Sequence, residues 1–148
     1  MLIVGLSGLG VEIAKNVVLA GVKSVTLLDS TPVTLNDYGT NFFLNEMHIG
    51  TSRATASSTS LQELNGYVSV SVEEGQLSAE MVASHSIVIM VDAHKDILLQ
   101  VNGWARDGEV CPLLAWWLAF LMNICARSFF TEQADCSRCN GNCDVCLQ

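Results

Sequence analysis

The sequence predicts an α/β fold in which helices wind around both faces of a mostly parallel sheet. Over residues 1–110, short apolar runs that suit buried strands alternate with segments of helical periodicity. The first thirty residues also place a strand, a glycine-rich turn, a helix, a second strand and an acidic residue in that order. Right-handed connections between parallel strands then bring the turns that follow the strands to one edge of the sheet.

The first unit of the chain supplies each of these elements in turn. An apolar run over Leu2–Val4 predicts the first strand, and apolar residues recur at helical spacing from Val11 onward. Gly21 suits the residue just after a helix, where a left-handed backbone is common. The apolar run Ser24–Leu28 predicts the second strand, and Asp29 follows it directly.

Three glycines and one acid in this unit are candidate nucleotide-binding residues. Gly5 suits a tight turn, Gly8 lets the backbone approach a phosphate, and Gly10 lets the helix pack on the sheet. Free N–H groups at a helix start near Val11 would point at an anion. Asp29 comes 19 residues after Gly10, where an acid can bond a ribose hydroxyl. The alternative is that the glycines serve only the turn and the packing of the helix.

The rest of the first 110 residues continues the alternation. Residues 30–50 read as a loop with local turns, in which Phe42 and Phe43 form an apolar pair that we expect to be buried. Asp92 follows an apolar strand, so we expect it to share a crevice with Asp29 and with Gly5–Gly10, the glycine turn. The further elements predicted are helices over 51–65, 78–84 and 97–104 and strands over 67–72 and 86–91.

Composition narrows the classes of partner. The chain has 148 residues, a formal net charge of −8 and a mean hydropathy of +0.38. With 7 Lys and Arg against 15 Asp and Glu, no basic face for nucleic acid is expected, and anionic membranes are disfavoured. The amino-terminal stretch does not resemble a signal peptide. We therefore expect a cytosolic domain that binds neither nucleic acid nor membrane.

Several separate segments of residues 1–110 resemble one family. GLSGLGVEIAKNVVLAGVKSVTLLD, NFFLNEMHIGTSRA and LQELNGYVSV are similar to the N-terminal half of ubiquitin-activating enzymes, their inactive adenylation domain. The resemblance implies a Rossmann-like fold of the ThiF type and a cytoplasmic and nuclear location. The family uses ATP and magnesium to form an acyl-adenylate at the C-terminal glycine of ubiquitin or a ubiquitin-like protein.

The resemblance also implies roles for individual residues. Asp29 matches the Asp that holds the ATP ribose in active halves, and Asp92 matches their magnesium-binding Asp. Arg53 lies at the position of a phosphate-binding Lys, while Gly39-Thr40-Asn41 lies where active halves carry Asn-Arg-Gln. Phosphoryl chemistry depends on cations that neutralise developing charge, and residues 39–41 supply none. The chain therefore resembles the non-catalytic half, which pairs with an active adenylation half.

Residues 111–148 depart from the family and are expected to form a divergent, cysteine-rich tail. The sheet is therefore expected to be incomplete and the chain to be a fragment. The run Leu113–Cys125 is almost wholly apolar but shorter than a bilayer requires, which favours a buried helix or strand in place of the missing part of the sheet. Four cysteines follow at the spacing C-x2-C-x3-C-x2-C: Cys136, Cys139, Cys143 and Cys146. The paired spacing is typical of a zinc site, with an iron–sulfur site and chance spacing as the alternatives.

Two other functions remain open from the sequence. The same strand–turn–helix unit occurs in NAD- or nucleotide-dependent oxidoreductases, although no residue of the chain stands out as the acid or base for hydride transfer. The chain is alternatively an inactive truncated fragment.

Overall fold

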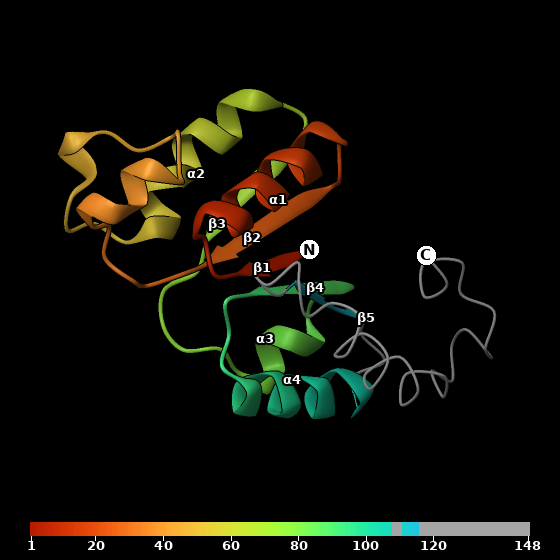
Figure 1. Ribbon diagram of the computed structural model, residues 1–148. Helices are drawn as coiled ribbons and strands as arrows, with labels where there is room; N and C mark the ends of the chain where they lie inside the picture. Colours follow the sequence, from red (N-terminus) through yellow and green to blue (C-terminus); the bar gives the residue numbers. More distant parts are fainter. Residues whose placement is uncertain (108–110, 116–148) are drawn as a thin grey trace.

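The computed structural model describes residues 1–107 and 111–115. Its centre is a parallel sheet with the strand order β3-β2-β1-β4-β5. The strands are β1 (Leu2–Val4), β2 (Ser24–Leu28), β3 (Ser69–Val72), β4 (Ile87–Val91) and β5 (Cys111–Ala115). The first strand of the chain is thus the middle strand of the sheet, and the chain runs outward from it first on one side and then on the other (Figure 1).

Four α-helices cover the two faces of the sheet in pairs (Figure 1). The helices are α1 (Gly8–Leu19), α2 (Arg53–Leu64), α3 (Ala79–Ala83) and α4 (Lys95–Asp107). One buried cluster joins α1 and α2 to one face, and a second cluster joins α3 and α4 to the other. The prediction of a doubly wound α/β fold is confirmed.

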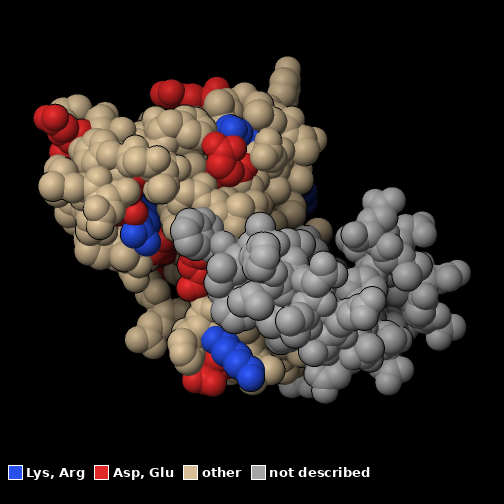
Figure 2. All heavy atoms as spheres, in the orientation of Figure 1, with Lys and Arg blue, Asp and Glu red and all other residues tan. Residues whose placement is uncertain are grey.

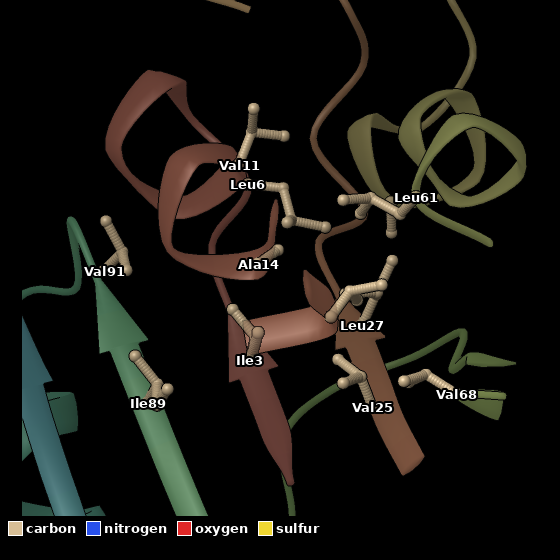
Figure 3. Close-up of a cluster of buried hydrophobic side chains, with 12 residues drawn as sticks. Ile3, Leu6, Val11, Ala14, Val25, Leu27, Leu61, Val68, Ile89 and Val91 are labelled. Atoms are coloured by element: carbon tan, nitrogen blue, oxygen red, sulfur yellow. The ribbon is translucent and has the colours of Figure 1, made fainter. Parts of the chain in front are cut away.

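The cluster under α1 and α2 follows from the alternation of side chains along the strands. Ile3 on β1, Leu27 on β2 and Ile89 on β4 point to the same face, where they meet Val11 and Ala14 of α1 (Figure 3). The neighbouring residues Leu2, Leu28 and Met90 belong to the cluster on the other face. Strands buried on both faces explain why the sequence shows continuous apolar runs there.

Several predicted element ends were displaced. Helix α1 begins at Gly8, three residues before the predicted start at Val11, because the glycine-rich segment itself forms its first turn. Helix α4 extends beyond the predicted 97–104 at both ends. The predicted loop over residues 30–50 contains two short 3-10 helices, η1 (Leu35–Gly39) and η2 (Glu46–His48). The expected burial of Phe42 was wrong, since this side chain is 57% exposed.

Strand β5 lies at the start of residues 111–148, the stretch that is expected to depart from the family. It pairs in parallel with β4, with Leu113 opposite Ile89. The strand includes residues 113–115, the start of the apolar run over residues 113–125. The sequence favoured either a helix or a strand for this run, and its start is a strand. The rest of that run lies outside the described residues.

Gly10 is the position where a side chain fits least well. A Cβ built on Gly10 would lie 2.0 Å from the carbonyl oxygen of Gly5, whereas one built on Gly103 of α4 would meet nothing within 4 Å. We predict that Gly10→Ala lowers the free energy of unfolding by about 3 kcal/mol, the upper end of overpacking costs. Gly103→Ala should raise it by about 0.5–1 kcal/mol, because alanine favours a helix.

Urea unfolding of the two variants beside the parent chain measures both effects. Each variant adds one methyl group to a helix, so only the surroundings differ. Equal stability of Gly10→Ala and Gly103→Ala would show that the contact of α1 with the glycine turn is not close.

Candidate functional site

The candidate site lies at the carboxyl ends of β1, β2 and β4. The turn after β1 is held between the two neighbouring strands: the Gly5 N–H donates to the Leu28 carbonyl at 3.0 Å. On the other side, a Cβ built on Gly5 would lie 2.3 Å from the Val91 carbonyl oxygen. Gly5 also has a φ of +87°, which favours glycine. Gly5 therefore serves the tight turn, as the sequence predicted.

Asp29, which follows β2, binds this turn through a hydrogen bond. Its carboxylate accepts the Leu6 N–H at 2.7 Å and the Thr31 N–H at 2.9 Å, one on each oxygen. The residue is only 9% exposed. Asp29 thus lies beside the glycine turn as predicted, but both of its oxygens already accept backbone hydrogen bonds that shape the site.

Asp92 makes the corresponding contact from β4. The Ser7 hydroxyl donates to its Oδ2 atom. Asp92 is exposed and has a φ of +55°, a left-handed backbone that a non-glycine residue seldom adopts. The glycine turn therefore bonds to the residues that follow both neighbouring strands, which places Asp29 and Asp92 on either side of it.

The start of α1 is covered by the segment that follows η1. The first N–H that closes the helix is that of Val11, which donates to the Ser7 carbonyl at 2.9 Å, so the preceding N–H groups face outward along the axis. Thr40 lies against this end: a Cβ built on Gly8 would be 2.7 Å from the Thr40 Cβ and 3.0 Å from its carbonyl oxygen. The space beside Gly8, predicted to admit a phosphate, is bordered by this chain's own Thr40.

Arg53, the predicted phosphate ligand, lies between two carboxylates. Its Nη2 atom is 2.7 Å from Asp37 Oδ1, and its Nη1 atom is 4.0 Å from Asp29 Oδ2. The arginine is the first residue of α2, and Ser52 caps that helix through a hydrogen bond from the Thr55 N–H at 3.1 Å. The cluster therefore joins α2, η1 and the end of β2.

Asp37 is the site residue that the sequence reading missed. Its Oδ2 atom accepts the Thr34 N–H at 2.7 Å and the Thr34 hydroxyl at 2.9 Å, which closes a capping box at the start of η1. The spacing Thr34-x-x-Asp37 is the signal that would have found this box. The partnership with Arg53 has no such local signature, because it joins residues 16 positions apart.

The environment of Asp37 keeps its carboxylate charged. Burial raises the pKa of Asp37, but hydrogen bonds from the Thr34 backbone and from Arg53 outweigh it, and the pKa lies below its ordinary value. The Arg53 Nε atom is buried and has no hydrogen-bond partner within residues 1–106. Of the two carboxylates beside the guanidinium, Asp37 is the nearer.

Asn41 has a structural role. Its side chain is 2% exposed, donates to the Ser57 hydroxyl at 3.1 Å and accepts the Phe43 N–H at 3.0 Å. The buried Asn41 side chain therefore connects the loop over residues 30–50 to α2. None of residues 39–41 places a cation beside the glycine turn, in agreement with the sequence.

The sequence profile of the ThiF family matches residues 1–97. The chain belongs to the ThiF family. Among curated relatives it is 52% identical over 109 residues to ubiquitin-activating enzyme E1 2 of Arabidopsis thaliana, an alignment that covers 74% of this chain and 10% of that protein. It is 40% identical over 115 residues to ubiquitin-like modifier-activating enzyme 1 of Homo sapiens, covering 78% of this chain and 11% of that protein. The chain thus spans about a tenth of the length of these relatives, and the resemblance to ubiquitin-activating enzymes is confirmed.

Solved structures share the fold of this ThiF-family chain. The tRNA N6-threonylcarbamoyladenosine dehydratase of Escherichia coli in complex with AMP superposes with a TM-score of 0.67 at 18% identity, covering 76% of this chain and 49% of that one. PaaA superposes with a TM-score of 0.66 at 18% identity, covering 76% of this chain and 36% of that one. These likenesses establish a Rossmann-like fold of the ThiF type.

The basic side chains at the site are paired with carboxylates of the same chain. Arg53 is engaged by Asp37, and Thr40 borders Gly8. Lys15, the cation on α1, is paired with Glu12. On the face shown in Figure 2, basic side chains form small separate patches, most of them beside acidic ones. The site has the glycine turn and helix start that the sequence predicted, and its cations in the described part of the chain face carboxylates.

Metal-binding groups and membrane-spanning helices are both absent from the described residues. These residues contain no group of three or more His, Cys, Asp or Glu that is placed to hold a metal ion. Nor do they include a helix that has both the length and the apolar character to cross a membrane. The predicted zinc ligands Cys136, Cys139, Cys143 and Cys146 lie outside the described residues.

Acid should remove the contribution of Asp37 to stability. Because the folded-state pKa of Asp37 is lowered, its contribution is fully present above the ordinary aspartate pKa of about 3.9. The contribution is lost as the pH falls through the lower, folded-state value. We predict that Asp37→Asn lowers the urea midpoint at pH 7, and that the difference from the parent chain shrinks between about pH 4 and pH 2. A difference that stays constant with pH would contradict the charged pairing with Arg53.

Proposed function

We propose that this chain is the non-catalytic adenylation half of an activating enzyme for ubiquitin or a ubiquitin-like protein. In this role it pairs with an active adenylation half and supports the formation of an acyl-adenylate there. Sequence identity to ubiquitin-activating enzymes supports the class of enzyme. The ionic pairing of Arg53 with Asp37 supports the lack of catalysis by this chain.

The chemistry explains why that pairing matters. Adenylation transfers AMP from ATP to a carboxylate and releases pyrophosphate, so negative charge gathers on the leaving phosphates. Enzymes stabilise this charge with cations already directed at it. Here Arg53, the cation at the family's phosphate-binding position, is directed at a carboxylate of the same chain. We accordingly propose that the partner half binds ATP and magnesium and carries out the reaction of ATP.

Asp29 and Asp92 have structural roles, which a non-catalytic half also needs. Each bonds the glycine turn, through the Leu6 N–H and the Ser7 hydroxyl respectively. These contacts hold α1 and the crevice in the shape that the family shares. In the proposed pair, these contacts preserve the surface against which the active half would pack.

The purified chain alone should not catalyse ubiquitin-dependent exchange of pyrophosphate into ATP. The measurement is incorporation of labelled pyrophosphate with ATP, magnesium and ubiquitin present, and a complete ubiquitin-activating enzyme serves as the positive control. Exchange above the level seen without ubiquitin would overturn the proposed function.

A further inference from the structure

We infer that Asp37 excludes polyphosphate anions from the crevice by occupying Arg53 in their place. The inference deepens the proposed function, on which it rests, by naming the residue that keeps this half from binding the triphosphate. Asp37 is thus an internal counter-anion, and Arg53 is an anion-binding residue whose position is already filled.

The first support is the position of Arg53. Its guanidinium is 4.0 Å from Asp29 Oδ2, and that same oxygen accepts the Leu6 N–H of the glycine turn at 2.7 Å. The arginine therefore lies beside the turn, separated from it by one carboxylate. A cation beside the turn that leads into α1 adds to the attraction of the helix start for an anion.

The second support is the local balance of charge. One guanidinium faces two carboxylates, Asp29 and Asp37, whose side chains are 6% and 8% exposed. Charges this well shielded from water interact more strongly than exposed ones. The cluster thus carries a formal excess of one negative charge, which repels an incoming polyphosphate. Replacing Asp37 with a neutral residue leaves Arg53 balanced by Asp29 alone.

The third support is that Asp37 is fixed in this place. Thr34 donates to its Oδ2 atom from both the backbone and the hydroxyl, while Arg53 binds Oδ1. The carboxylate is held by η1 and cannot swing away without breaking the capping box. Thr40, the residue directly after η1, lies against Gly8 and so borders the start of α1.

The test measures binding of ATP and of inorganic tripolyphosphate to the full 148-residue chain by titration calorimetry, without ubiquitin. Asp37→Asn keeps the size of the side chain and an acceptor for the Thr34 N–H. We expect it to bind both anions at least about tenfold more tightly than the parent chain, because a charge-assisted partner of Arg53 is removed. Asp37→Ser, also neutral and able to cap η1, is expected to show the same gain and replaces Asp37→Asn if that variant does not fold.

Two controls assign the gain to Arg53. Glu63→Gln removes the same charge from an exposed position of α2 and should leave binding unchanged. The double variant Asp37→Asn with Arg53→Gln should lose the gain. Folded neutral variants that bind no better than the parent, or a gain that survives loss of Arg53, would overturn the inference.

Failure of the inference is distinct from failure of the proposed function. Pyrophosphate exchange by the parent chain would overturn the function, and it is read in a separate assay that contains ubiquitin. The binding comparison depends only on whether the Asp37 carboxylate competes with a polyphosphate for the Arg53 guanidinium.

Discussion

The carboxylate of Asp29 joins three parts of the chain that are otherwise separate. It accepts N–H groups from the glycine turn and from the start of the loop after β2, and the Arg53 guanidinium of α2 lies 4.0 Å away. A buried carboxylate is costly unless hydrogen bonds and charge compensate it. The glycine turn, the loop and α2 therefore have to keep their places together. Asp37 and Arg53 extend this dependence to η1.

The fold followed from the sequence because its signals are local and repeated. Apolar runs such as Ile87–Val91 reveal strands that are covered on both faces, and Gly21, with a φ of +78°, marks the end of α1 as expected. The placement of Asp29 and Asp92 beside the glycine turn also followed, because right-handed connections leave little freedom in where these turns lie. These predictions required no knowledge of side-chain contacts.

The ion pairing at the site could not be predicted from the sequence in the same way. The partners Arg53 and Asp37 meet only after the loop over residues 30–50 has folded, and that loop carries no regular periodicity. Glycine-rich spacing predicted a place for a phosphate beside Gly8 but could not show that Thr40 borders it. Phe42 is hydrophobic yet 57% exposed, since apolar character alone does not determine burial in a loop.

The order of the strands has a consequence for biosynthesis. β1 is made first but lies in the middle of the sheet, and its partners are β2 on one side and β4 on the other. The residues that pair β1 with β2 lie within residues 2–28, while the opposite edge of β1 has no partner until Met90 is available to pair with Val4. During that interval an apolar strand edge is open to incorrect pairing with other chains. Synthesis that stops before β4 would leave this edge open for good.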